Sequence, residues 1–183
     1  EALTILSGGR ELVAVAADEV VHVERLHVPS FHTYHPDTPT LPWIAGAGVH
    51  RPTLLEARRR WLAAAGAEPG DRRVLLLREG GARGLINAER LAQIASRRGF
   101  EPVDPGKLSF VEQVRLIHGS AIICGVGGAA LANLLFCRPG AKVLSLVSEQ
   151  LADFTMQAHL ADLAGAEFTH VTGPSGSQTS STT

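Results

Sequence analysis

The residues best suited to chemistry stand around a glycine-rich turn, residues 125–129, with the sequence Gly-Val-Gly-Gly-Ala. An apolar run, Ala121 to Cys124, precedes the turn and is typical of a strand buried on both faces of a parallel sheet. Residues 129–136 are predicted to form a helix after the turn. Glycines allow the backbone to approach a ligand closely, and the N–H groups at the start of a helix favour an anion. The turn therefore predicts a binding site for a phosphorylated ligand.

Two arginines follow another predicted strand, Val74 to Leu77. Arg78 stands at its carboxyl end, and Arg83 stands in the loop behind it. Ligands of open α/β sheets bind outside the carboxyl ends of the strands, and guanidinium groups pair well with diphosphates. Ion pairs with Glu79 or Glu89 at the surface are the alternative explanation of these arginines.

Two polar residues near predicted helix starts also have two explanations. Asn87 is positioned to cap a helix, and Ser109-x-x-Glu112 has the pattern of a capping box. Either Asn87 or Glu112 could instead contact a ligand, and the sequence leaves both roles open.

The elements that must position these residues alternate between strand and helix along most of the chain. Phe110, Val114 and Ile117, for example, fall on one face of a helix. Such alternation, with strands of the buried type, predicts a Rossmann-like three-layer α/β sandwich with a mostly parallel sheet.

We expect three parts in the chain. Residues 1–28 contain apolar runs, Leu3 to Leu6, Leu12 to Val15 and Val20 to Val28, that are predicted as N-terminal strands. Residues 29–172 form the main domain, and the Ser- and Thr-rich residues 173–183 form a disordered tail. Because the first residue is Glu1, we expect the chain to be a piece of a longer product.

Composition narrows the class of protein. Of 183 residues, 45% are apolar and 19% charged, and the net charge of −1 gives no argument for nucleic acid binding. No apolar run approaches the roughly 18 residues that a membrane span needs. Cys124 and Cys137 are predicted to be buried thiols, which favours a cytoplasmic setting. The basic run Arg58 to Arg60, with Glu56 nearby, is predicted to be a solvated helix face.

Two groups of motifs carry a resemblance to a known family, glycosyltransferase family 61. Its EQ and GxHGAxLxNxxF signatures resemble Glu112-Gln113 and then Gly125, Gly128, Ala129, Leu131, Asn133 and Phe136. Arg78, Arg83 and Asn87 stand where the family usually has two arginines and an asparagine. The resemblance covers residues 28–171. Two positions differ, because Gly127 replaces a histidine and Ser145 replaces an acidic residue.

The resemblance implies a fold and an activity. The family includes bacterial capsular-polysaccharide biosynthesis proteins and eukaryotic O-GlcNAc and xylosyl transferases. Its enzymes have the two-domain GT-B architecture, and this chain is similar to the C-terminal, donor-binding half. It would transfer a sugar from a nucleotide-sugar, most simply of the UDP type, to a hydroxyl of a glycan or other acceptor.

The resemblance also implies which residues bind the donor. They are Arg78, Arg83, Asn87, Glu112, Gln113, Gly125, Gly127, Gly128, Ala129 and Asn133. No metal or other cofactor is expected. The general base would come from the missing half or from the proline-rich loop, Phe31 to His50. In that loop His32, His35 and Asp37 match no standard zinc spacing, so a loop bordering a cleft is favoured over a metal site.

Two alternatives remain. Gly125-x-Gly127-x-x-Ala130 fits the fingerprint of NAD-binding oxidoreductases, but Ser145 stands about 20 residues on, where an acidic residue is expected. A non-catalytic relative that acts as a binding module is favoured by the changes at Gly127 and Ser145. The retained Arg78 and Arg83 argue against that second alternative.

Overall fold

The computed structural model describes residues 1–27, 33–34, 48–77, 85–149, 152 and 155–174. The chain divides into two compact units, residues 1–61 and 62–183, which we describe separately. Arg78, Arg83, His32, His35 and Asp37 lie outside the described residues, as do residues 175–183 of the predicted tail.

The first unit contains a short helix, a strand pair and most of a longer helix. Helix α1 (Ala2–Ser7) ends at Gly8, whose φ of 63° is left-handed. Strands β1 (Thr33–Tyr34) and β2 (Gly48–Val49) pair antiparallel, and helix α2 (Arg51–Ala65) follows them. The Trp61 Nε1–H donates to the Ala2 carbonyl at 3.0 Å, which joins α2 to α1.

The N-terminal strands predicted from the apolar runs were wrong. Leu3 to Leu6 form part of α1, and residues 10–27 contain no helix or strand. Their apolar side chains are exposed, Val20 by 82%. A strand needs a partner for its backbone N–H and C=O groups, and the β-propensity of valine and leucine does not supply one.

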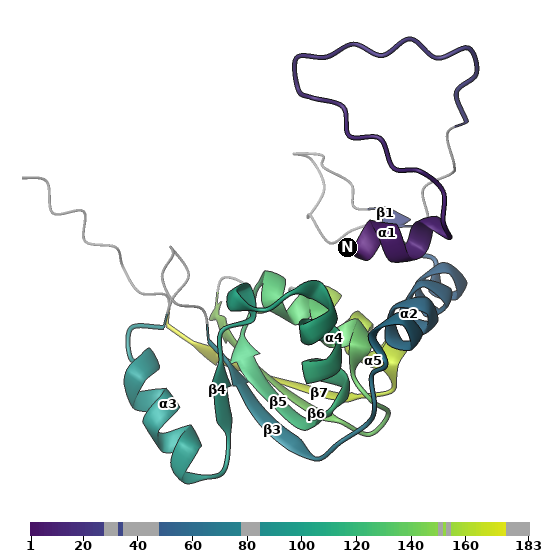
Figure 1. The fold of residues 1–183 in the computed structure, drawn as a ribbon. Helices are drawn as coiled ribbons and strands as arrows, with labels where there is room; N and C mark the ends of the chain where they lie inside the picture. The colour runs from purple at the N-terminus through teal and green to yellow at the C-terminus, as the bar shows by residue number, and fades with distance from the viewer. Residues whose placement is uncertain (28–32, 35–47, 78–84, 150–151, 153–154, 175–183) are drawn as a thin grey trace, which may run out of the picture. The chain divides into compact units, whose positions relative to one another are not determined.

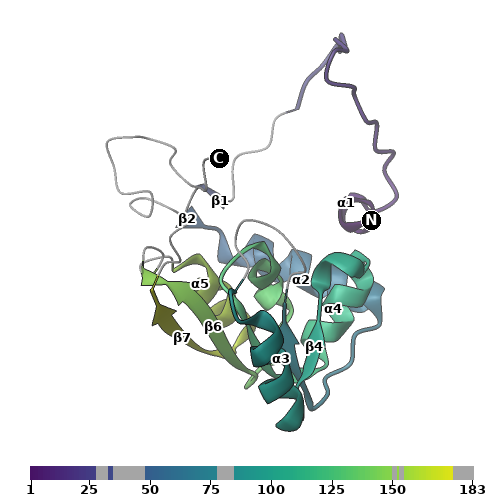
Figure 2. The ribbon, with the colours of Figure 1, turned by 90° about the vertical axis from the view of Figure 1, so that its left-hand side faces the viewer.

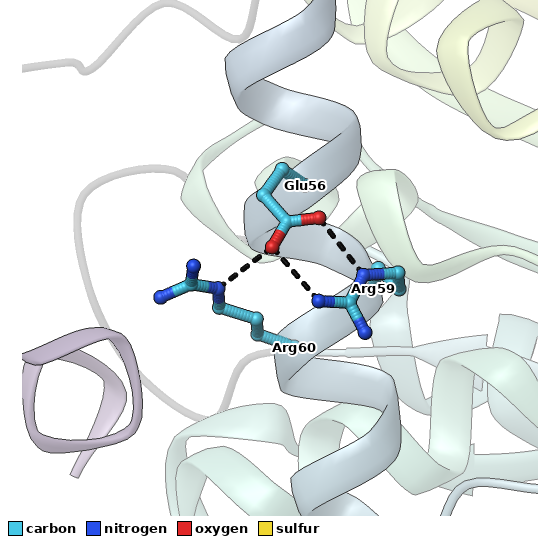
Figure 3. Close-up of polar contacts among 3 residues, drawn as sticks. All are labelled: Glu56, Arg59 and Arg60. Atoms are coloured by element: carbon cyan, nitrogen blue, oxygen red, sulfur yellow. Dashed lines mark hydrogen bonds and ion pairs between the residues drawn. The ribbon is translucent and has the colours of Figure 1, made fainter. Parts of the chain in front are cut away.

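The charged surface of α2 is a solvated helix face, as the sequence predicts. Glu56 accepts hydrogen bonds from Arg59 and from Arg60, each at 2.8 Å (Figure 3). The hydrogen bond from Arg59, followed in size by the hydrogen bond from Arg60, lowers the pKa of the Glu56 carboxyl to about 2. The exposed fraction of each of the three side chains is about half or more, so the two arginines and the glutamate form ion pairs at the solvent-exposed surface.

The second unit is built on a five-stranded parallel sheet with the order β4-β3-β5-β6-β7 (Figure 1). Its strands are β3 (Arg72–Leu76), β4 (Glu101–Val103), β5 (Ser120–Val126), β6 (Lys142–Ser148) and β7 (Glu167–Gly173). Its helices are α3 (Ala88–Arg97), η1 (Pro105–Lys107), α4 (Phe110–His118), η2 (Ala129–Phe136) and α5 (Met156–Ala164).

The helices cover both faces of this sheet. Helix η2 packs between α4 and α5, and α3 packs on the edge strand β4 (Figures 1 and 2). The connection from β3 to β4 moves toward one edge of the sheet, whereas the later connections, from β4 to β5, β5 to β6 and β6 to β7, move toward the other edge. Because such crossovers are right-handed, α3 lies on the other face from α4, η2 and α5. The predicted Rossmann-like α/β sandwich is confirmed.

The helix after the glycine turn is a 3₁₀ helix. Its backbone repeat is three residues, so side chains three apart share a face. Leu131, Leu134 and Cys137 have this spacing, and all three are completely buried. Cys124 is buried in β5, so both cysteines are buried thiols as predicted.

The described helices include none with the length and apolar character that crossing a membrane requires.

Replacing Ile123 with alanine tests the position of β5 in the core. The Ile123 side chain is fully buried. We expect the free energy of unfolding to fall by about 2–5 kcal/mol, because lost transfer energy and a new cavity add together. Ile86→Ala is the matched control, since that side chain is 94% exposed and its loss should cost no more than about 0.5 kcal/mol. Urea denaturation measures both variants, and equal losses would contradict the fold.

Candidate functional site

The connections that leave β3 and β5, two neighbouring strands, cross the sheet in opposite directions. The connection from β3 leads to one edge of the sheet, and the connection from β5 leads toward the other. In parallel sheets a crevice opens at the carboxyl ends of such a strand pair, and ligands bind there. Leu76 pairs with Gly125, so β3 and β5 end side by side. The glycine turn therefore begins at the point of the sheet where the direction reverses.

Gly125 allows three elements to approach closely. A Cβ atom on this residue would lie 3.1 Å from the Leu76 Cβ and 3.4 Å from the Leu131 Cδ2. The glycine thus has a packing role between β5, β3 and η2. A role in binding a ligand stays a prediction for Gly125.

Gly127 lies against β6 with no room for a side chain. A Cβ atom there would be 2.6 Å from the Val147 Cγ1, well inside van der Waals contact. The Gly127 N–H donates to the Leu146 carbonyl at 2.7 Å, which holds the turn against β6. A histidine would need Val147 to move, and this accounts physically for the glycine at the position where the sequence motif usually has histidine.

Gly128 is different, because packing within the protein does not require it to be glycine. Its backbone is extended, with φ 168° and ψ −167°. Among the residues that the structure describes, a Cβ atom there would meet only the Val126 carbonyl oxygen, at 4.0 Å. The Gly128 carbonyl accepts hydrogen bonds from the Leu131 N–H at 3.0 Å and from the Gln157 Nε2 at 3.3 Å. No described side chain therefore fills the space beside Gly128, and two hydrogen bonds hold its carbonyl.

Glu112 serves the start of its own helix. The Ser109 Oγ accepts from the Glu112 N–H at 3.3 Å, and the Glu112 Oε2 accepts from the Ser109 N–H at 2.7 Å. This is the capping box that the sequence indicates. The hydrogen bonds with the Ser109 side chain and backbone lower the pKa of the exposed Glu112 carboxyl.

Gln113 and Asn133, two predicted donor-binding residues, are brought together and bind each other. The Asn133 Nδ2 donates to the Gln113 Oε1 at 2.6 Å. The Gln113 Nε2 donates to the Leu108 carbonyl at 3.1 Å, so both ends of this amide are engaged. The pair joins α4 to η2, and an edge-to-face contact of Phe110 with Phe136 joins them further along. A contact of either amide with a ligand stays a prediction.

Asn87 is exposed at the first position before α3. It occupies the capping position, but its side chain makes no capping hydrogen bond. Helix capping therefore explains why Asn87 stands before α3, but it gives no role to the amide group of its side chain.

Two buried polar residues, Ser145 and Gln157, lie near the turn, and the sequence predicts no binding role for either. They bind each other, with the Ser145 Oγ donating to the Gln157 Oε1 at 3.2 Å. Gln157 shares its helix with two other polar residues, His159 and Asp162, so its role cannot be recognised from the sequence without knowing which face of the helix is covered.

No group of three His, Cys, Asp or Glu side chains suited to a metal ion occurs among the residues that the structure describes. The prediction that the site needs no metal remains untested.

Comparison with known proteins identifies the class to which this fold and turn belong. The model of the glycosyltransferase 61 family matches residues 3–144, and the chain belongs to that family. A 70-residue segment is 30% identical to the xylan glycosyltransferase MUCI21 of Arabidopsis thaliana. That segment covers 37% of this chain and 14% of the plant protein.

Alanine substitutions at the two neighbouring glycines should have opposite effects on stability. Gly127→Ala should lower the free energy of unfolding by about 1–3 kcal/mol, because its methyl group overlaps Val147. Gly128→Ala should leave it unchanged or raise it by up to about 1 kcal/mol, because the backbone there suits alanine. Urea denaturation of the two single variants measures the difference.

A second substitution tests the cause. Val147→Ala removes the overlapping methyl group, so the double variant Gly127→Ala/Val147→Ala should be more stable than the two single losses predict, by about 0.5–3 kcal/mol. Simple additivity would show that the overlap is not the reason.

The capping box predicts a dependence of stability on pH. A carboxyl whose pKa is lowered in the folded chain stabilises the fold above its unfolded pKa, about 4.3 for glutamate, and this contribution is lost as the pH falls through the folded value. Thermal unfolding followed from about pH 5 downward should therefore show a decline that Glu112→Gln reduces. Ser109→Ala should reduce it too, and an unchanged acid profile in both variants would contradict the capping role.

Proposed function

We propose that this chain is the donor-binding part of a glycosyltransferase, which transfers a sugar from a nucleotide-sugar of the UDP type to an acceptor hydroxyl. The observation that carries the proposal is the glycine turn at the reversal point of the sheet, where no side chain of the described residues fills the space beside Gly128. That space is suited to a diphosphate approaching backbone N–H groups at the start of η2. Membership of the glycosyltransferase 61 family supports the same activity.

The chemistry of the transfer requires stabilisation of a leaving group. The bond from the sugar's anomeric carbon to the diphosphate oxygen breaks, and a bond from that carbon to the acceptor oxygen forms. Negative charge grows on the departing nucleoside diphosphate, and cationic or N–H groups fixed around it lower the barrier. Arg78 and Arg83, which follow β3 in the sequence, are proposed to supply the positive charge.

The acceptor hydroxyl must lose its proton to a general base. We assign no residue to that role, and the base would come from the loop Phe31 to His50 or from a second domain. The matched plant protein is named as a xylan glycosyltransferase. This supports a polysaccharide as acceptor, and synthesis of a bacterial capsule in the cytoplasm is the specific form of the proposal. The buried thiols Cys124 and Cys137 are in keeping with a reducing compartment.

A dinucleotide-binding oxidoreductase is less well supported. In that class an acidic residue at the end of the next strand binds the ribose hydroxyl. Ser145 is the residue about 20 positions after the glycine turn; it lies within β6, is completely buried, and its hydroxyl donates to Gln157. It therefore offers no carboxylate to a ribose.

Thermal shift of the whole chain with UDP, UDP-sugars, GDP, CDP and NAD tests the proposal. A ligand at 100 times its dissociation constant should stabilise the fold by about 2.7 kcal/mol. We expect UDP or a UDP-sugar to raise the melting temperature, and Arg78→Ala or Arg83→Ala to reduce that shift. Ile86→Ala, on an exposed side chain of the same unit, is the control that should retain it.

Other outcomes would assign the chain differently. Stabilisation by NAD alone would support the oxidoreductase. No stabilisation by any of these nucleotides would support a non-catalytic module.

A further inference from the structure

Two buried polar side chains lie next to the glycine turn and connect to it through consecutive hydrogen bonds. Ser145 lies on β6 and is completely buried, and Gln157 is the second residue of α5 and is 3% exposed. The Ser145 Oγ donates to the Gln157 Oε1 at 3.2 Å. The Gln157 Nε2 in turn donates to the Gly128 carbonyl at 3.3 Å. This series of hydrogen bonds therefore connects β6, through Gln157 of α5, to the glycine turn.

The bond to the Gly128 carbonyl fixes the direction of the next peptide group. The peptide between Gly128 and Ala129 is planar and trans, so its carbonyl and its N–H point in opposite directions. With the carbonyl held by Gln157 and by the Leu131 N–H, the Ala129 N–H is directed away from α5. That N–H is one of the groups proposed to meet the diphosphate.

Packing by the described residues restrains the turn little at this point. Among those residues a Cβ atom on Gly128 would have one neighbour within 4 Å, the Val126 carbonyl oxygen. Hydrogen bonds therefore supply much of the restraint, and an amide is suited to this because it has a donor and an acceptor. Ser145 donates to the acceptor end, so the NH₂ end faces Gly128.

We propose that Gln157 is a positioning residue of the donor site. Its hydrogen bond to the Gly128 carbonyl holds the glycine turn in the conformation that presents the Ala129 N–H to the donor's diphosphate, and Ser145 orients the amide. The inference rests on the proposed function, but its effect on the turn can be measured without any ligand.

The first experiment uses no ligand. Gln157→Met keeps an unbranched side chain of similar length and removes the donor and the acceptor. In ¹H–¹⁵N spectra of the whole chain we expect the Gly128 and Ala129 amide signals to shift, while the amides of β3 and β4 keep their positions. Unchanged Gly128 and Ala129 signals would overturn the proposal.

The second experiment measures UDP binding by calorimetry. Gln157→Met should raise the dissociation constant of UDP about tenfold, the effect of losing one well-placed hydrogen bond or its geometry. Gln157→Glu is the matched variant, because a carboxylate keeps the acceptor for Ser145 and lacks the donor for Gly128. It should weaken binding by a similar factor, and wild-type affinity in both variants would overturn the proposal.

Ser145→Ala provides a test that survives if the Gln157 variants fail to fold. It removes one oxygen atom and leaves the glutamine in place. We expect the same two amide signals to move by less, and the dissociation constant to rise about threefold. No change in either measurement would count against the chain of bonds.

The two proposals fail in different ways. If the wild-type chain does not bind UDP, the proposed function fails, and the spectra of Gln157→Met still decide whether Gln157 holds the turn. If the wild type binds UDP and the Gln157→Met chain binds it equally well, the function stands and the positioning role is wrong.

Discussion

The contact between Gly127 and β6 is the constraint on which the rest of the site depends. The Gly127 N–H is bonded to the Leu146 carbonyl, and Val147 occupies the space that a side chain would need. The turn therefore leaves β5 directly against its neighbouring strand, with no side chain between them. In the proposed function, the backbone N–H groups that meet the diphosphate are therefore held by the sheet and do not depend on a flexible side chain.

The 3₁₀ helix after the turn is held by polar contacts on two sides and by apolar contacts beneath. On one side Asn133 binds Gln113 of α4, and on the other Gln157 of α5 binds the Gly128 carbonyl. Beneath it, Leu131 and Leu134 are completely buried. The apolar contacts provide most of the free energy, and the hydrogen bonds select one orientation of the peptide groups among several with similar packing.

The sequence predicts the sheet well because each strand of the sheet carries its own signal. Ala121 to Cys124 is apolar on both faces and lies in a central strand. The prediction fails at the N-terminus, where Val20 has high β-propensity but no strand beside it. The sequence also does not predict the role of Gln157. The role of a buried amide depends on which carbonyl lies opposite, and the packing of α5 on η2 determines that carbonyl. The motif residues Gln113 and Asn133 could be recognised by pattern, but their mutual bond could not.

The replacements at positions 127 and 145 act on one small region, because a Cβ atom on Gly127 would lie 3.6 Å from the Ser145 Oγ. A histidine and a carboxylate there would be ionisable groups in a buried setting, where charge is costly unless it is paired. Glycine and serine leave only neutral groups behind the turn, and Gln157 completes their hydrogen bonding. The hydrogen bonds among Ser145, Gln157 and the Gly128 carbonyl therefore involve no group that titrates in the range of histidine and carboxylates.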